Sequence, residues 1–144
     1  RLGRVSVFDR SWYGRVLVER VEGFAKRAEW RRAYGEIEAF EQQITAQGAV
    51  LVKVWLHVSP EEQARRFDER SQVSFKRYKI GPDDWRNRAR AFDYEAAAVE
   101  MFESTSGAAP WHVVPADDKN RARIEVIKRV CAAYEERLRS ARDV

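Results

Sequence analysis

The stretch Val5-Ser6-Val7-Phe8-Asp9-Arg10-Ser11-Trp12-Tyr13-Gly14-Arg15 joins a short apolar segment to an acidic residue flanked by arginines. The apolar part predicts a buried β-strand over Val5–Phe8. Loops after the strands of a parallel sheet line a crevice at the carboxyl ends of the strands, so Asp9, Arg10 and Arg15 are expected there. A carboxylate can hold Mg²⁺ and guanidinium groups can hold phosphate oxygens, as phosphoryl transfer requires. Taken alone, these residues are equally consistent with another interpretation, in which Asp9 caps a helix and the arginines are merely solvated.

The rest of the chain alternates strand and helix patterns. A nearly continuous apolar run over residues 49–58 predicts a second strand covered on both faces, and residues 111–114 predict a third. Helices are predicted near residues 16–22, from about Trp30 to Gly48, from Ser59 to about Arg70, from Pro82 to about 104, and from Asp117 or Asp118 onward. This order is typical of an α/β fold with a parallel sheet and helices on its faces.

Three helices carry apolar residues at helical spacing, and these stripes are expected to pack on the sheet. The stripes are Trp30, Tyr34, Ile37, Phe40 and Ile44; Trp85, Ala89, Phe92, Ala96 and Val99; and Ile124, Ile127, Cys131, Tyr134 and Leu138. Cys131 is therefore expected to be a packed residue and not a nucleophile.

The composition indicates one soluble globular domain. The chain has 144 residues, of which 35% are charged and 44% hydrophobic, and no apolar run approaches the roughly 20 residues of a membrane span. A single cysteine and the absence of a secretory signal pattern favour the cytoplasm. The net charge of +4 suits an anionic partner. Nucleic acid is one such partner on charge alone, but no zinc spacing, RNP-like string or helix-turn-helix pattern supports it.

The string FDRSWYGRVLVERVEGF, Phe8–Phe24, resembles the signature of the second family of polyphosphate kinases, which move phosphate between polyphosphate and nucleotides. Later blocks resemble that family in the same order, namely Lys76–Ile80, Asp84–Arg88, Ala109–Trp111 and Asp118–Arg123. The resemblance spans nearly the whole chain but covers only the later part of the family's domain.

The resemblance implies a P-loop kinase-like fold: a three-layer parallel sheet with flanking helices and a helical lid at about residues 70–90. Residues 1–144 are then a single phosphotransferase-like domain, incomplete at the N-terminus, because the phosphate-cradling motif G-x-x-x-x-G-K-[ST] does not occur in the sequence. The strand with that motif lies in the middle of such a sheet, so Val5–Phe8 is expected to be poorly paired without it. The chain is therefore expected to need a complementing N-terminal segment or a homo-oligomer.

The resemblance also implies roles for individual residues. Asp9 matches the family's second acidic motif and is the predicted catalytic, Mg²⁺-binding carboxylate. Arg10 is the second predicted catalytic residue, and Arg10 and Arg15 are predicted to bind the phosphates. Further phosphate-binding residues are predicted in and near the lid, with a solvated basic turn as the alternative: Arg70, Lys76, Arg77, Lys79 and Arg86. Lys119 and Arg123 are predicted to contact the nucleotide, and structural capping of the last helix is an equal alternative.

The expected function is phosphate transfer between polyphosphate and AMP or ADP, with ATP among the nucleotides bound and Mg²⁺ as the cofactor. The Asp84–Arg88 block favours AMP. The isolated chain is expected to be inactive without a P-loop. The alternative is a non-catalytic remnant or truncated half of such a kinase that serves as an assembly or anion-binding module, and another nucleotide kinase of the same fold ranks just below the first hypothesis.

Overall fold

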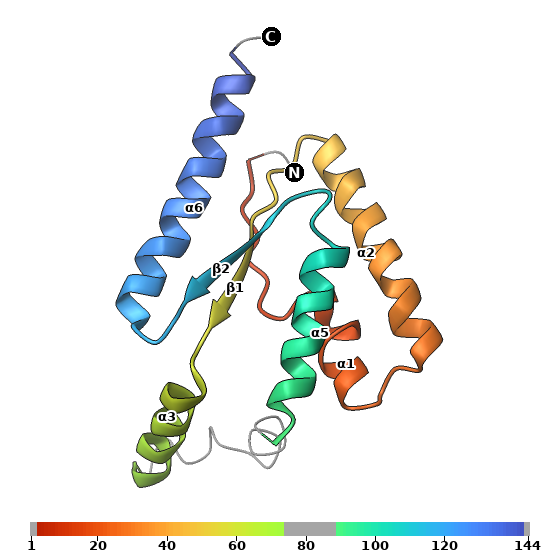
Figure 1. The fold of residues 1–144 in the computed structure, drawn as a ribbon. Coiled ribbons are helices and arrows are strands. Elements are labelled where there is room, and N and C mark those ends of the chain that lie inside the picture. The colour runs from red at the N-terminus through yellow and green to blue at the C-terminus, as the bar shows by residue number, and fades with distance from the viewer. Residues whose placement is uncertain (1–2, 74–88, 143–144) are drawn as a thin grey trace.

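The computed structural model describes residues 3–73 and 89–142 and has the α/β architecture that the sequence predicts. The elements, in chain order, are the 3₁₀ helix η1 (Trp12–Arg15), α1 (Val18–Val21), α2 (Arg27–Ala46), β1 (Lys53–His57), α3 (Pro60–Gln72), α5 (Ala91–Ser104), β2 (Trp111–Pro115) and α6 (Lys119–Ser140) (Figure 1).

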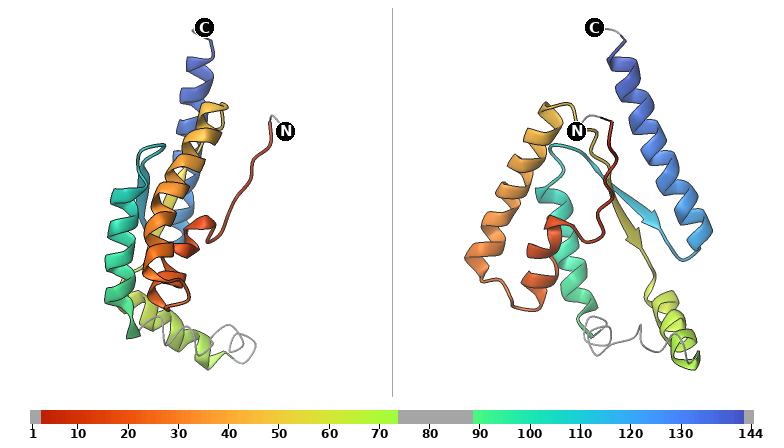
Figure 2. Two further views of the ribbon diagram at one scale, coloured as in Figure 1. Left: turned by 90° about the vertical axis from the view of Figure 1, so that its right-hand side faces the viewer. Right: turned by 180° about the vertical axis from the view of Figure 1, so that it is seen from behind.

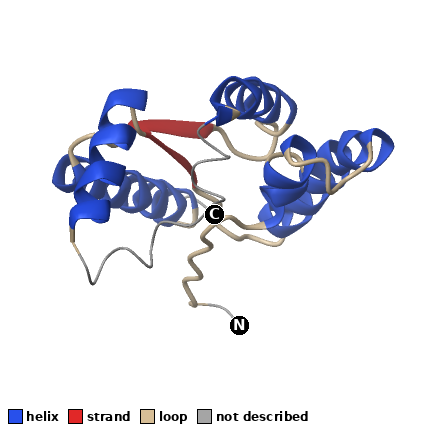
Figure 3. Cartoon of the chain, turned by 90° about the horizontal axis from the view of Figure 1, so that it is seen from below, coloured by secondary structure: helices blue, strands red, loops and turns tan. Residues whose placement is uncertain are grey.

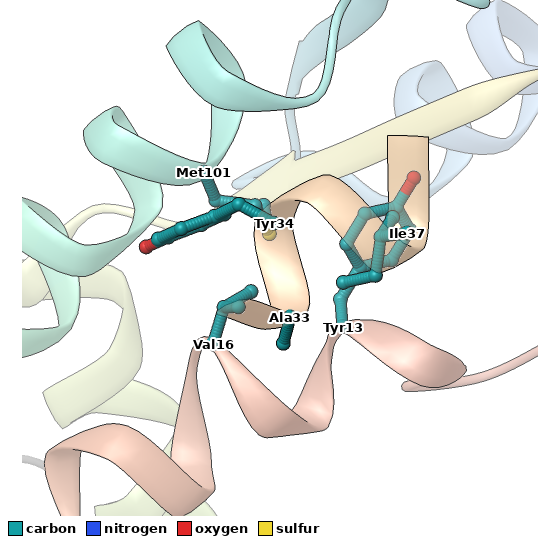
Figure 4. Packing of buried hydrophobic residues seen from close by; sticks show 6 residues of the cluster. All are labelled: Tyr13, Val16, Ala33, Tyr34, Ile37 and Met101. Atoms are coloured by element: carbon teal, nitrogen blue, oxygen red, sulfur yellow. The ribbon is translucent and has the colours of Figure 1, made fainter. Parts of the chain in front are cut away.

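The strands β1 and β2 form a parallel two-stranded sheet, in which Lys53 lies opposite Trp111 and His57 opposite Pro115. Successive side chains of a strand point to opposite faces, so each face of the sheet carries its own apolar cluster. The larger cluster is built on η1, α2 and α5, and its buried members are Tyr13, Val16, Ala33, Tyr34, Ile37 and Met101 (Figure 4). The smaller one joins β2 to the start of α6 and consists of Val114, Ala116 and Ala122. Helices accordingly lie on both sides of the strands (Figure 3).

The prediction of a buried strand over Val5–Phe8 is wrong. This segment does not form a strand, and the exposed fractions of Val7 and Phe8 are 91% and 64%. A strand needs a neighbour that bonds its N–H and C=O groups. In the described residues β1 and β2 pair with each other, while the N-terminal segment projects away from the rest of the chain (Figure 2). The sheet of the described residues therefore has two strands instead of the expected three, and Val5–Phe8 is unpaired there.

The second predicted strand is shorter and less covered than expected. Residues 49–52 precede β1, and within β1 the side chain of Leu56 is 55% exposed. Leu56 points to the same face as Val54 and Val58, which pack against the smaller cluster. The helix on that face, α6, packs against β2, so the free-edge side of β1 is left open to water.

The stripe predicted for α2 is confirmed in part, whereas the one predicted for α5 has the wrong register. Tyr34 and Ile37 of α2 are buried, Trp30 and Ile44 are half-buried, and Phe40 is 44% exposed. In α5, however, Phe92 is 87% exposed, and the buried residues are Ala97, Ala98 and Met101. Two adjacent alanines allow the α5 backbone to lie close to its neighbours, and this close approach decides which face is covered.

The stripe predicted for α6 is exposed. Ile127 and Leu138 are 62% and 57% exposed, and Cys131 is exposed as well, so the expectation of a packed cysteine is wrong. The cause is the tilt of α6, which meets the sheet near Ala122 and then diverges from it (Figure 1). No helix in the described ranges is both long and apolar enough to cross a lipid bilayer.

Two helix starts are fixed by side-chain caps. The Ser59 hydroxyl accepts a hydrogen bond from the Glu62 N–H at 3.2 Å, with Pro60 as the first helical residue, as the sequence predicts. The Asp118 carboxylate accepts from the N–H groups of Asn120 and Arg121 at 2.8 and 3.0 Å. These hydrogen bonds hold the pKa of Asp118 below its usual value. The caps fix where α3 and α6 leave the sheet.

Candidate active site

Asp9 and Arg10 form an exposed bend between the extended N-terminal segment and η1. Arg10 has a φ of 56°, in the left-handed region that non-glycine residues seldom occupy. This conformation costs roughly 1–2 kcal/mol for an L-residue, and such residues persist where the surrounding structure holds them. The bend joins the extended N-terminal segment to η1 at the start of the candidate site.

Arg15 lies at the end of η1, with its guanidinium accessible to solvent. Its Nη1 is 3.0 Å from Oε2 of Glu19, and the two side chains are 45% and 35% exposed. An exposed pair of this kind contributes little free energy. The guanidinium therefore pairs weakly, and a phosphate could compete for it. Arg15 also borders an open cavity of about 240 Å³, whose lining residues are Trp12, Arg15, Ala33, Glu36, Ile37 and Phe40.

The residues between Arg10 and Arg15 anchor the segment in the core. The Trp12 indole donates to Oε1 of Glu41 at 3.1 Å, and the Tyr13 hydroxyl donates to the same oxygen. Burial, together with the hydrogen bond to Glu41, raises the pKa of Tyr13 well above its usual value, so the phenol stays protonated and remains a donor. Val16, directly after η1, is fully buried. The exposed residues Arg10 and Arg15 thus flank two aromatic residues, of which Trp12 is half-buried and Tyr13 is buried.

The Glu41 carboxylate is itself held by a buried lysine, which sequence reasoning missed. Lys53 Nζ lies 2.8 Å from Glu41 Oε2, and the two side chains are 2% and 0% exposed. The sequence does contain a signal for this pair. Lys53 interrupts an apolar strand run, and Glu41 shares the helical face of Ile37 and Ile44, so an acid and a base both fall on positions predicted to be buried.

The predicted lid residues fall largely outside the described part of the chain. Lys76, Arg77, Lys79 and Arg86 lie outside the described residues. Arg70 is in the last turn of α3 and is half-buried. It follows the carboxyl end of β1 in the chain, which is the side of the sheet where the resemblance implies a lid.

The predicted nucleotide-binding residues Lys119 and Arg123 are exposed on the first turns of α6. Arg123 Nη1 lies 3.1 Å from Oδ1 of Asn120. The cap of this helix is Asp118, so capping does not need either basic side chain. Both side chains are exposed to solvent, although Arg123 also donates to Asn120.

A magnesium ion would find one carboxylate donor at the candidate site. In the ranges that the structure describes, no group of three or more His, Cys, Asp or Glu side chains could hold a metal. Mg²⁺ usually keeps several waters and binds through one or two carboxylates plus substrate phosphates. The exposed Asp9 fits that manner of binding, but it does not form a metal site by itself.

Comparison with known proteins confirms the resemblance seen in the sequence. The model of the polyphosphate kinase 2 (PPK2) family matches residues 1–142. A polyphosphate:AMP phosphotransferase of Pseudomonas syringae pv. tomato is 51% identical over 134 residues, which are 92% of this chain and 27% of that protein. A polyphosphate:AMP phosphotransferase of Acinetobacter johnsonii is 50% identical over 127 residues, 88% of this chain and 27% of that protein.

The fold agrees with a solved structure of the same family. The crystal structure of polyphosphate kinase 2 from Arthrobacter aurescens TC1 matches with a TM-score of 0.86 and 44% identity, over 91% of this chain and 47% of that one. The chain spans 27% of the length of the two curated relatives. Because the family model covers nearly every residue from the Asp9–Arg15 segment to the end of α6, this chain belongs to the polyphosphate kinase 2 family.

Proposed function

We propose that the protein takes part in phosphate transfer between polyphosphate and a nucleotide, with AMP as the preferred acceptor and ADP as the next. The observation that carries this proposal is the Asp9–Arg15 segment, in which exposed charged residues flank aromatic side chains fixed to a buried carboxylate. Such a segment offers a carboxylate and two guanidinium groups that are accessible to solvent next to an anchored turn. Membership of the polyphosphate kinase 2 family and the two relatives named polyphosphate:AMP phosphotransferase support the same conclusion.

Arg10 and Arg15 neutralise the charge that develops on the phosphate oxygens as phosphate is transferred. Their planar guanidinium groups can donate two parallel hydrogen bonds to one phosphate. Further along the polymer, phosphates are bound by Arg70, Lys76, Arg77, Lys79 and Arg86. Lys119 and Arg123 at the start of α6 contact the nucleotide.

Asp9 is the residue that would hold Mg²⁺, together with the substrate phosphates. When bound, the ion neutralises phosphate charge and aligns the transferred group. Asp9 precedes Arg10 in the chain, and Arg10 has the left-handed backbone conformation of the bend. The reaction needs no covalent intermediate on the protein, because positioning and charge neutralisation are sufficient for phosphoryl transfer.

The experiment is a luminescent assay of nucleotide products from polyphosphate with AMP or with ADP, run on this chain with Mg²⁺. Asp9→Asn and Asp68→Asn are compared, because Asp68 is an exposed acid of α3 that accepts from Gln72 at 2.9 Å and lies outside the site. Turnover that Asp9→Asn abolishes and Asp68→Asn preserves supports the proposal. Turnover that is equal in both variants contradicts it.

A second candidate function is an anion-binding or assembly module without its own turnover. The observation that favours it is that the sequence contains no G-x-x-x-x-G-K-[ST] motif, which cradles phosphates in P-loop enzymes. On this hypothesis the chain binds polyphosphate but releases no product in the same assay. Activity would then need a complementing segment or a second copy, so product that forms only on mixing with a P-loop partner would identify this case.

A further inference from the structure

Glu41 is fully buried, and its two carboxylate oxygens serve different parts of the fold. Oε2 accepts from Lys53 Nζ at 2.8 Å. Oε1 accepts from the Trp12 indole at 3.1 Å and from the Tyr13 hydroxyl. One oxygen is therefore bound to the sheet, and the other to the segment that carries the proposed phosphate-binding residues.

Lys53 fixes the position of the Glu41 carboxylate from the sheet side. It is the first residue of β1, lies opposite Trp111 of β2, and its ammonium also donates to the carbonyl of Thr105 after α5. Thr105 is fully buried, and its hydroxyl accepts from the Trp111 indole at 3.0 Å. The carboxylate is thus held by groups from both strands and from the end of α5.

The orientation of Trp12 and Tyr13 sets that of η1. The N–H groups of Val16 and Leu17 both donate to the Tyr13 carbonyl at 3.1 Å, so the turn that ends at Arg15 is built on this residue. Arg10 lies two residues before Trp12, and Arg15 lies two residues after Tyr13. Movement of the two aromatic rings would therefore move both guanidinium groups.

Stability alone does not account for a buried ion pair at this place. Replacement of such a pair by apolar residues of similar volume is often neutral or stabilising. An apolar residue at position 41, however, could not accept hydrogen bonds, so the buried hydroxyl of Tyr13 and the half-buried indole of Trp12 would lose their acceptor. The Glu41 carboxylate thus supplies a defined position for the segment that an apolar core would not supply.

We propose that Glu41 is a positioning residue for the Arg10–Arg15 segment, and that Lys53 holds Glu41 in place for this purpose. The proposal rests on the proposed function in so far as this segment binds polyphosphate. Glu41 touches neither the phosphate nor the nucleotide, and it acts through Trp12 and Tyr13.

The test compares two neutral double variants of the full chain, Glu41→Gln with Lys53→Met and Glu41→Met with Lys53→Met. Both remove the ion pair, but only the glutamine keeps a carbonyl oxygen that accepts from Trp12 and Tyr13. Amide hydrogen exchange of Val16 and Leu17 reports the order of η1, and fluorescence anisotropy of labelled polyphosphate reports affinity. Only the variant with Glu41→Met and Lys53→Met loses these hydrogen bonds. In that variant alone, amide exchange of Val16 and Leu17 should accelerate and the Kd for polyphosphate should rise about tenfold.

Equal exchange rates in the two double variants would overturn the proposal. If the wild-type chain binds no polyphosphate, the proposed function fails, and the exchange rates still decide the positioning role. If the methionine variant does not fold, Trp12→Phe with Tyr13→Phe removes the two donors and leaves the ion pair intact. Faster exchange at Val16 and Leu17 in that variant supports the proposal, and unchanged exchange overturns it.

Discussion

Arg15 and Glu19 form an ion pair of 3.0 Å across one turn, and its counterpart in α6 joins Arg129 to Glu125 at 2.8 Å. Both pairs have the i,i+4 spacing, and the two arginine side chains are 45% and 48% exposed. The acid follows the arginine in the first pair and precedes it in the second, and the first pair lies at the candidate site whereas the second lies on an open helix. Because the two arginines are similarly exposed, removing each in turn distinguishes a phosphate-binding role of Arg15 from the general effect of one positive surface charge.

Arg15→Ala should weaken polyphosphate binding, and Arg129→Ala should leave it nearly unchanged. A cation that contacts a phosphate of a polyanion releases bound counterions, so its loss should reduce the slope of log K against log salt by about 0.7–1. Anisotropy titrations with labelled polyphosphate over a range of salt concentrations measure that slope. Equal losses of affinity and slope in both variants would mean that Arg15 contributes only to the net charge.

Asp9→Asn should remove the part of polyphosphate or ATP binding that depends on Mg²⁺ and leave the Mg²⁺-independent part intact. The reason is that an amide is a much weaker ligand for Mg²⁺ than a carboxylate, while Arg10 and Arg15 are unaltered. Isothermal titration of ATP with and without Mg²⁺ measures the difference, and Asp68→Asn serves as the matched acid control. A Mg²⁺ effect of the same size in Asp9→Asn and the wild type would show that another group binds the ion.

Lys53→Met and Glu41→Met as single variants should each lower the free energy of unfolding by about 3–5 kcal/mol, because each leaves an uncompensated buried charge. The double variant Glu41→Met with Lys53→Met should recover only the part of this loss that comes from the unpaired charge, because Trp12 and Tyr13 still lose their acceptor. Urea unfolding followed by circular dichroism gives the three values, and their non-additivity gives the coupling energy. Single variants that lose less than about 1 kcal/mol would indicate that water reaches the remaining charge.

The sequence predicts the local elements of this fold better than their packing. Ser59 and Pro60 define the start of α3 through short-range chemistry, and the structure confirms this start. The Val5–Phe8 segment has an equally clear local pattern, but a strand also requires a neighbour, and none bonds to it in the described residues. Strand identity is thus a property of the assembled sheet and cannot be read from the segment alone.

The same distinction applies to helix faces and to the candidate site. In α5 the large residue Phe92 suggests the core face, but Ala97 and Ala98 are buried because their small side chains allow close approach. The charged residues Asp9, Arg10 and Arg15 can be identified from their motif, since their chemistry depends on residue type. The Glu41 and Lys53 pair could not be identified with equal ease, because its contacts join residues distant in sequence.

Glu62, in the first turn of α3, should make stability depend on pH in acid. Hydrogen bonds from Arg65, and then from Arg66, lower its pKa from 4.5 to about 2. A carboxyl group with a depressed pKa in the folded state contributes fully above its unfolded pKa and loses that contribution as the pH falls through the folded value. The urea midpoint of the wild type should therefore decrease as the pH is lowered from 4.5 to about 2.

Glu62→Gln should flatten this decrease more than Glu125→Gln, which removes the partner of Arg129 in α6. Parallel midpoint curves for the wild type and Glu62→Gln would place the acid sensitivity in another group.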